Sequence, residues 1–426
     1  MRINRFDWDG RDAAKPADEI RALQPPLGEV SDAVAEIVSA VESEGDAAVL
    51  RLEERFAGVA PESLRVEDDE LRRAPDRIPE ELAAALRTAI ENVRRVAELS
   101  ATASPVGGNG SGVSFQDVPV AAAGAYVPGG ATAYPSTAVM CCVPARVAGV
   151  ERVAVATPPG AGGAVSAEVL AACALAGATE VYAMGGAQAI AAFALGTEAV
   201  ASVDIVVGPG NRYVQEAKRQ LAGRVGIDGI AGPSELMAVI DGDTELRWIA
   251  LDLCAQAEHA DDGLLVACAA DAALLGRLEE LVVQLAGERE TVQDAALALV
   301  TVPSADAAVE LGNALAPEHL ELACDGAEVL AQMVRYAGCV FIGPGGATAF
   351  GDYAAGSNHV LPTGGAGRFQ GPLGPETFRR RIATVEFGAR VAAELAPTVA
   401  TLARAEGFPV HAESAEARAK GGDRPR

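Results

Sequence analysis

Apolar residues recur every three or four positions over two long stretches near the start of the chain. Residues 30–56 (VSDAVAEIVSAVESEGDAAVLRLEERF) and 79–101 (PEELAAALRTAIENVRRVAELSA) both follow this period, which is typical of a helix with one buried face. Ser31 or Asp32 is the expected N-cap of the first helix, because short polar side chains accept hydrogen bonds from its free N–H groups. A polar, glycine-rich stretch at 106–112 then predicts a hinge.

From about residue 117 the pattern changes. Short β-branched runs alternate with alanine-rich helical stretches in two sets, at 117–223 and 263–346. This alternation predicts helices packed on parallel sheets, which makes the chain an α/β protein. The first hundred residues and the segment after about 376 have a helical pattern.

Composition narrows the range of functions. The chain has 426 residues and a formal net charge of −25, and a protein this acidic repels nucleic acids and anionic membranes, so we expect neither as a partner. The charged N-terminus lacks the apolar core of a signal peptide. No apolar stretch of about 18 residues qualifies as membrane-spanning once its glycine and proline content is considered. We therefore expect a cytoplasmic protein.

The seven cysteines lie mostly in apolar runs. Their odd number and the lack of a Cys-x-x-Cys motif favour buried, reduced thiols over disulfides or a cysteine zinc site.

The chain has only four histidines, and each lies beside polar residues: His259, His319, His359 and His411. Histidine suits proton transfer near neutral pH and is the commonest metal ligand in proteins. This small set therefore contains the first candidates for catalysis or metal binding.

Two segments have the character of a metal site. Gln256 and His259 are three residues apart near the end of a predicted helix, a spacing that places both side chains on one face. Asp352 lies seven residues before His359 in a glycine-flanked loop, and a carboxylate there suits Zn²⁺. In isolation, the first pair is more often a solvated helix end, and the second is more often a capping aspartate with a surface histidine.

Glu318 and His319 are adjacent, just after Pro317 and near a predicted helix start. Two such titratable groups can divide the roles of general acid and general base. The alternative is an ordinary helix N-terminus, where proline followed by glutamate is common.

Three glycine-rich turns follow apolar runs, at 126–130, 184–188 and 207–211. Such turns allow backbone N–H groups to approach a phosphate at a helix N-terminus. No Gly-x-Gly-x-x-Gly motif is present, so a dinucleotide site would be of a variant kind.

Taken together, the chain from about residue 20 to about 415 resembles histidinol dehydrogenase. The motifs that carry the resemblance occur in the family's order: YVPGG (126–130), PST (135–137), GGAQAIAAFALGTE (185–198), VGPGNRYVQEAKR (207–219), AGPSEL (231–236), QAEH (256–259), PEHLEL (317–322), GDYAAGSNHVLPT (351–363) and EGFPVHAES (406–414). Two features depart from the usual pattern without replacing a matched residue, namely the Gly- and Ala-rich loop before Asp352 and the paired Cys141 and Cys142.

The resemblance implies a set of site residues. One Zn²⁺ per subunit would be held by Gln256, His259, Asp352 and His411. Glu318 and His319 would be the catalytic acid–base pair. Substrate would contact the four zinc ligands and His319, together with Ser234, His359 and Glu406. NAD would contact Tyr126, Gln188 and Asn211.

The implied reaction is the oxidation of L-histidinol to L-histidine through L-histidinal with two NAD⁺, the last steps of histidine biosynthesis. His319 would take the hydroxyl proton in the first oxidation, and Glu318 would activate water in the second. The alternative within this scaffold is a related zinc- and NAD-dependent alcohol dehydrogenase acting on another small diol. A zinc hydrolase and a non-enzymatic binding protein are the rivals from other classes.

The resemblance also implies an architecture. It predicts two α/β domains with incomplete Rossmann-like parallel sheets, plus small helical N- and C-terminal segments. The boundaries are an N-terminal segment at 1–20, a discontinuous first domain at 21–125 with 236–370, an NAD-contacting second domain at 126–235, and a C-terminal helical segment at 376–426. The last segment, with His411, would complete the partner's site in a homodimer with shared active sites.

Overall fold

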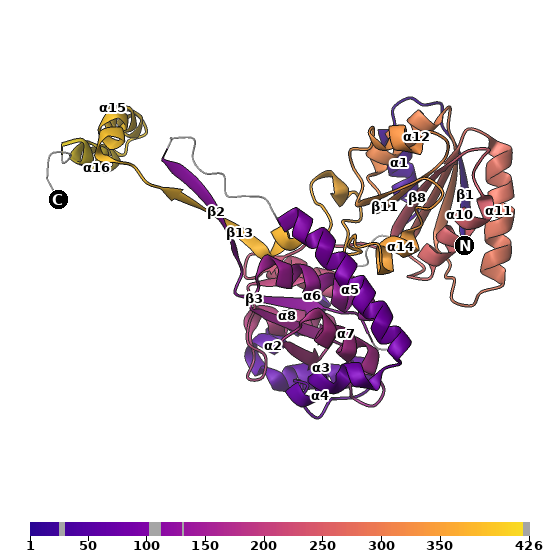
Figure 1. Cartoon of the computed structure of the whole chain (residues 1–426), viewed down its shortest axis with the longest axis horizontal. Coiled ribbons are helices and arrows are strands. Elements are labelled where there is room, and N and C mark those ends of the chain that lie inside the picture. Colours follow the sequence, from indigo (N-terminus) through magenta and orange to yellow (C-terminus); the bar gives the residue numbers. More distant parts are fainter. Residues whose placement is uncertain (25–29, 102–111, 130–131, 421–426) are drawn as a thin grey trace. The chain divides into compact units, whose positions relative to one another are not determined.

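The computed structural model describes residues 1–24, 30–101, 112–129 and 132–420. The chain divides into two compact units (Figure 1). The first unit comprises residues 1–101 and 119–378, and the second comprises 102–118 and 379–426. Apart from Gly112, the predicted hinge lies outside the described residues.

One parallel sheet of the first unit has five strands in the order β5-β4-β3-β6-β7. Their bounds are β3 (Ala122–Tyr126), β4 (Arg152–Thr157), β5 (Glu180–Ala183), β6 (Ile205–Val207) and β7 (Gly226–Ile227). After β3, the chain adds β4 and then β5 on one side of β3. It then crosses over and adds β6 on the other side of β3. The carboxyl ends of β3 and β6 therefore form a topological switch point, where open α/β sheets usually bind ligands.

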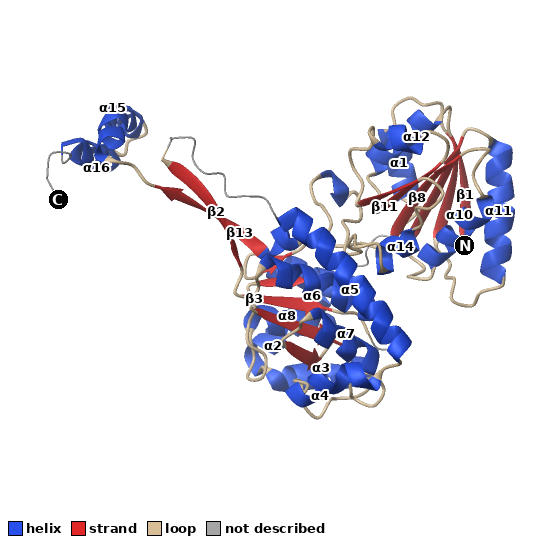
Figure 2. Cartoon of the chain, in the orientation of Figure 1, coloured by secondary structure: helices blue, strands red, loops and turns tan. Residues whose placement is uncertain are grey.

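Helices cover both faces of this sheet (Figure 2). One face carries α4 (Asp68–Arg73), a 3₁₀ turn (Ala74–Arg77), α5 (Glu80–Ala101), α6 (Pro135–Ala148) and α7 (Ala167–Ala176). The other face carries α2 (Ser31–Glu44), α3 (Asp46–Ala57), α8 (Gly186–Leu195) and α9 (Arg212–Leu221).

The packing of the N-terminal helices differs from the sequence-based grouping. Residues 31–101 were grouped with 236–370, but their apolar faces pack on the five-stranded sheet. An apolar period identifies a buried face without indicating which sheet it covers. The domain boundaries themselves stay a prediction.

The second sheet of the first unit has six parallel strands in the order β1-β10-β9-β8-β11-β12. Their bounds are β1 (Arg2–Asp7), β8 (Glu235–Ile240), β9 (Leu264–Ala269), β10 (Ala296–Thr301), β11 (His319–Ala323) and β12 (Cys339–Ile342). The start of the chain was expected to be helical, but β1 is an edge strand beside β10. Its partly exposed, charged sequence has too weak an apolar pattern to show this.

Helices also flank both faces of the six-stranded sheet. One face carries α1 (Ala14–Arg21), α12 (Ala305–Leu315) and α13 (Ala327–Ala331), and the other carries α10 (Leu246–Ala257) and α11 (Ala272–Gly287). The remaining elements are α14 (Thr348–Tyr353) and two 3₁₀ turns, Ala366–Arg368 and Pro375–Phe378.

The second unit combines a two-stranded sheet with a helix pair. Strands β2 (Val113–Pro119) and β13 (Arg379–Val385) form the sheet, followed by α15 (Ala389–Ala405) and α16 (Pro409–Lys420). Arg381 forms a two-point ion pair with Asp117 across the strands, at 2.7 Å. The segment after residue 376 was predicted to be helical, so β13 is a correction. Its pairing partner lies more than 250 residues earlier in the chain, beyond the reach of a local pattern.

The α/β prediction is confirmed, with parallel sheets and small terminal helices. Within the part of the chain that the structure describes, no helix has the length and apolarity needed to cross a membrane.

Candidate active site

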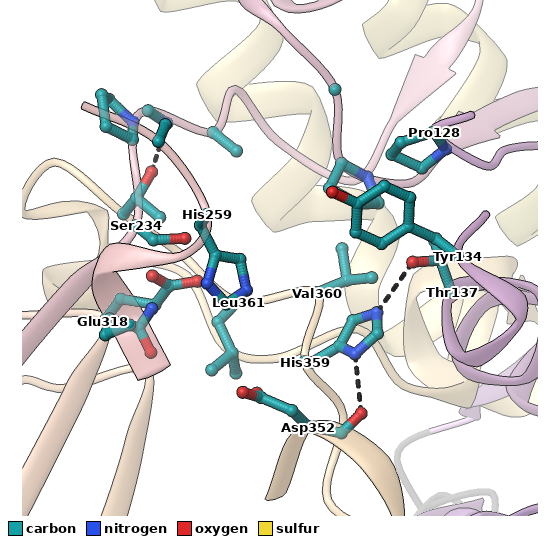
Figure 3. Close-up of a pocket in the computed structure, with 18 of the residues that line it drawn as sticks. Pro128, Tyr134, Thr137, Ser234, His259, Glu318, Asp352, His359, Val360 and Leu361 are labelled. Atoms are coloured by element: carbon teal, nitrogen blue, oxygen red, sulfur yellow. Dashed lines mark hydrogen bonds between the residues drawn. The ribbon is translucent and has the colours of Figure 1, made fainter. Parts of the chain in front are cut away.

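A cavity of about 700 Å³ lies in the first unit (Figure 3). The five-stranded sheet contributes the carboxyl ends of its switch-point strands, through Pro128 after β3 and residues 209–212 after β6. The six-stranded sheet contributes the amino ends of β8 and β11, through Ser234 and Glu318. The cavity therefore uses the usual ligand-binding edge of one sheet and the opposite edge of the other.

Most of the site residues expected from the sequence line this one cavity. They are Asn211, Ser234, Gln256, His259, Glu318, His319, Asp352 and His359. Their positions span about 150 residues of sequence, and the topology of the two sheets brings them together.

Glu318 and His319 do not start a helix, as the sequence pattern indicated. Glu318 precedes strand β11 and His319 is its first residue. A left-handed turn at Ala316 ends α12 and directs the chain into the strand. Both side chains are nearly fully buried, so neither is the solvated helix terminus considered as an alternative.

Glu318 is tied to the neighbouring strand β8. Its Oε2 accepts a hydrogen bond from the backbone N–H of Glu235 at 2.9 Å, and its own N–H donates to Glu235 Oε2 at 3.3 Å. Burial raises the pKa of Glu318 to about 7, although the adjacent His319 acts in the opposite direction. This carboxyl group is therefore set to exchange a proton near neutral pH.

Glu235 was not among the expected site residues, although it lies in the AGPSEL motif. Its carboxylate is almost fully buried and forms an ion pair with Arg21 of α1. It also accepts a hydrogen bond from Gly364 N at 3.0 Å. Sequence pattern could not reveal this role, because Arg21 is 214 positions away.

His319 is oriented by the backbone. Its Nδ1 lies 3.0 Å from the carbonyl oxygen of Glu235, which can only accept, so Nδ1 carries the proton. Among the described residues no group hydrogen-bonds to its buried Nε2, which lies 3.6 Å from Asp352 Oδ1. In neutral His319, Nε2 is therefore the free basic nitrogen.

The charge of His319 depends on its acidic neighbours. Burial lowers the pKa of His319, but Glu318 and Asp352 outweigh burial and raise it to about 9. In turn, although burial raises the pKa of Asp352, His319 and the other nearby histidines hold it below its usual range.

His359 has both ring nitrogens in use (Figure 3). Its Nδ1 donates to the backbone oxygen of Asp352 at 2.9 Å, so its Nε2 accepts from the hydroxyl of Thr137 at 3.1 Å. Burial lowers the pKa of His359, which favours this neutral form. Thr137 belongs to the PST motif on α6, but only the fold shows its contact with His359.

The expected metal ligands of the first unit meet one test of fit. Within the described residues, Oε1 of the buried Gln256 has no hydrogen-bond partner, and an unpaired amide oxygen suits a cation. His259 lies just after α10, and Asp352 lies on the short helix α14 instead of the expected loop.

In the described residues, no three His, Cys, Asp or Glu side chains are grouped to hold a metal ion. Gln256 is not one of these four residue types, and it lines the same cavity as His259 and Asp352.

The remaining expected residues are not among those that line the cavity. Tyr126 and Gln188 are buried in the five-stranded half, where the Tyr126 hydroxyl accepts from Gly186 N at 3.1 Å and the Gln188 amide donates to Glu53 at 2.7 Å. Glu406 and His411 are exposed residues of the second unit.

None of the seven cysteines lines this cavity. Cys141 and Cys142 are fully buried in α6, and burial raises the pKa of both thiols well above the usual range. All seven cysteines are free thiols.

Comparison with known proteins gives a consistent result. The histidinol dehydrogenase family model matches residues 24–419. The histidinol dehydrogenase of Synechococcus sp. is 43% identical over 401 residues, covering 92% of each chain. That of Haloarcula marismortui is 43% identical over 399 residues, covering 91% of this chain and 93% of the other.

A solved structure is also similar. The crystal structure of histidinol dehydrogenase from Elizabethkingia anophelis matches with a TM-score of 0.89 at 27% identity, covering 99% of this chain and 98% of the other.

Proposed function

The chain belongs to the histidinol dehydrogenase family of oxidoreductases in histidine biosynthesis, and we propose that it oxidises L-histidinol to L-histidine through L-histidinal with two NAD⁺. The observation that carries the proposal is the pair Glu318–His319, buried at the cavity with one unpartnered imidazole nitrogen among the described residues. Each oxidation needs a proton acceptor close to the reacting carbon, and this pair offers two.

His319 is the base of the first oxidation. Its Nδ1–H is fixed on the Glu235 carbonyl, so Nε2 receives the hydroxyl proton as the alcohol becomes an aldehyde. The raised pKa of His319 originates in Glu318 and Asp352. If Asp352 held a cation, its effect on the imidazole would fall, which would shift the pKa of His319 down toward that of a neutral base.

Glu318 is the base of the second oxidation. The aldehyde must gain a water oxygen before it can lose a second hydride, and a carboxylate can take the proton of that water. With a pKa of about 7, Glu318 is both available as a carboxylate and basic enough to accept a proton near neutrality.

Zinc fits the proposal through Gln256, His259 and Asp352, with His411 of a second copy as the fourth ligand. Bound there, Zn²⁺ would have no redox role and would supply a fixed positive charge to help position the substrate. Ser234, His359 and Glu406 are the further substrate contacts that we propose, with Glu406 again from the second copy.

NAD⁺ fits the switch point of the five-stranded sheet, where Asn211 and Pro128 line the cavity. Its chemistry is to accept the hydride in both oxidations. Tyr126 and Gln188 remain proposed contacts; Tyr126 is the last residue of β3, and Gln188 lies in the first turn of α8, which follows β5. We further propose a cytoplasmic homodimer.

A substrate panel tests the function. Full-length protein loaded with Zn²⁺ is assayed for NADH formation with histidinol, histidinal and other small diols, before and after chelation. We expect turnover of histidinol and histidinal, loss of it on chelation, and recovery with Zn²⁺. Turnover of another diol without histidinol would favour the related alcohol dehydrogenase, and hydrolysis without NAD⁺ would favour a zinc hydrolase.

A further inference from the structure

Helix α9 directs a row of polar side chains at the switch-point edge of the cavity. Asn211 is its N-cap, and Gln215 and Lys218 follow one and two turns later on the same face. Gln215 and Lys218 are 3% and 1% exposed. Buried polar side chains must find partners, and these find theirs in two loops that line the cavity.

The first loop is the turn after β6, and it is held by a buried ion pair. Lys218 Nζ lies 2.5 Å from Asp228 Oδ1, and both side chains are nearly inaccessible. Lys218 also donates to the carbonyl of Gly208 at 2.9 Å, while Asp228 Oδ2 accepts from the N–H of Gly208 at 2.7 Å. The ion pair therefore hydrogen-bonds to both the N–H and the carbonyl group of Gly208.

Gly208 is itself tightly constrained. It has a φ of +112°, and a Cβ here would lie 2.2 Å from the carbonyl oxygen of Tyr126. Only glycine fits this close approach of the turn to the end of β3. Residues 209–212, which line the cavity, continue directly from this fixed point.

Gln215 connects the turn to the second loop. Its Nε2 donates to the carbonyl of Gly210 at 3.3 Å, and its Oε1 accepts from the N–H of Ala231 at 2.8 Å. Ala231 begins the segment 231–234, which lines the other part of the cavity and contains Ser234. A single amide thus bridges the two loops.

A buried ion pair is a costly way to stabilise a fold, because well-packed apolar residues often serve equally well. Lys218 and Asp228 are therefore better explained by what they hold than by stability. We propose that Lys218, Asp228 and Gln215 are positioning residues that keep the NAD⁺-facing turn 208–211 in register with the substrate-facing segment 231–234. This inference rests on the proposed use of NAD⁺.

Removing the contacts that Gln215 and Lys218 of α9 make should displace the turn 208–211 more than the segment 231–234. The segment 231–234 has other anchors, since Gly232 N donates to Thr363 Oγ1 and the carbonyl of Ser234 accepts from Leu264 N at 3.0 Å. The turn depends on α9 and Asp228. The effect should therefore fall on cofactor binding.

The test compares Gln215→Met and Lys218→Met with Gln220→Met in the zinc-loaded, full-length protein. Gln220 lies on the same helix, but its side-chain amide donates hydrogen bonds to Ser31 and Glu216. For the first two variants we expect the KM for NAD⁺ and the dissociation constant of NADH, measured by fluorescence titration, to rise about tenfold. The KM for histidinol and the zinc content should change less than about twofold, and Gln220→Met should match wild type.

A purely structural role would lower the melting temperature and the active fraction while leaving the NAD⁺ and NADH constants unchanged, and this result would overturn the inference. If Lys218→Met does not fold, Gln215→Met decides, because it removes no charge. A wild-type protein that neither binds NADH nor uses NAD⁺ would overturn the proposed function as well, whereas unchanged variants of an NAD⁺-using wild type would overturn the inference alone.

Discussion

At the scale of single residues, two carboxyl groups lie where a negative charge is costly. Glu318 is buried at the cavity with a pKa raised to about 7. Two residues after His319, the buried Glu321 has an Oε2 that receives no hydrogen bond from another described group, and its neighbour is the carboxyl group of Asp252 on α10. A proton shared between these two acids is the simplest way to satisfy both.

Glu318→Gln should separate the two oxidations. Glutamine can still accept from Glu235 N but cannot take a proton from water. We expect the rate of histidinal oxidation to fall by about 10²- to 10⁴-fold, the usual size of a general-base contribution, and histidinol oxidation to fall far less. Each half-reaction is measured by stopped-flow NADH formation, with exposed Glu310→Gln as the control. Equal losses in both would contradict the assigned role.

Glu321→Gln tests the shared proton through pH. Burial, and then the neighbouring carboxyl group of Asp252, raise the pKa of Glu321, so above the ordinary value of a glutamate the folded state retains a proton that the unfolded state has released. Stability due to this group therefore falls as the pH rises. A neutral glutamine avoids this loss, so its melting temperature should exceed wild type by an amount that grows from pH 5 to pH 8.5.

Calorimetry or dye-monitored melting at both pH values checks this, again beside Glu310→Gln. A difference between Glu321→Gln and wild type that is constant with pH, or that shrinks as the pH rises, would be incompatible with a shared proton.

At the scale of elements, residue types and spacing marked several residues that line the cavity but not the elements that support it. The Gln256–His259 spacing placed both near the end of a helix; Gln256 lies in the last turn of α10 and His259 just beyond its C-cap. The pattern around Glu318 predicts a helix start, but Glu318 precedes strand β11. The sequence did not reveal this strand because a short buried strand has no apolar periodicity of its own. The sequence also did not reveal that α1 supplies Arg21 as the ion-pair partner of Glu235, since only the tertiary fold brings these two residues together.

Arg21→Met tests that support. It leaves the Glu235 carboxylate buried without its cation, which should destabilise the fold by about 3 kcal/mol. Adding Glu235→Gln should recover part of the loss, because the remaining buried group is then neutral. Denaturant unfolding measures the stability of the single and the double variant. The control is Arg72→Met, which breaks an exposed ion pair and should change stability by less than about 0.5 kcal/mol. Strictly additive losses would show that Arg21 and Glu235 are not coupled.

At the scale of the whole molecule, the sequence predicted an α/β fold, and the two parallel sheets agree with it. It did not indicate which sheet the N-terminal helices cover, because an amphipathic pattern shows that a helix face is buried but not what it packs against. It also missed β13, whose partner strand is distant in sequence. Glu406 and His411, in the second unit, were assigned through resemblance alone, and their roles stay predictions.

A complementation experiment tests the shared site. His411→Asn should lose zinc and activity, and Glu318→Gln should form no histidine at an appreciable rate. If sites are shared, subunit exchange between the two should restore about a quarter of wild-type histidine formation, because half the dimers are mixed and each has one intact site. Mixed dimers confirmed by mass spectrometry but inactive would show that His411 serves its own subunit.

We propose that one site performs two successive oxidations. The decisive measurement is the ratio of NADH formed to histidinol consumed, with limiting histidinol, excess NAD⁺ and quantified histidine. We expect about two NADH per histidinol, one for each hydride transferred, with histidine as the product. One NADH per histidinol, with histidinal released and not oxidised further, would contradict it.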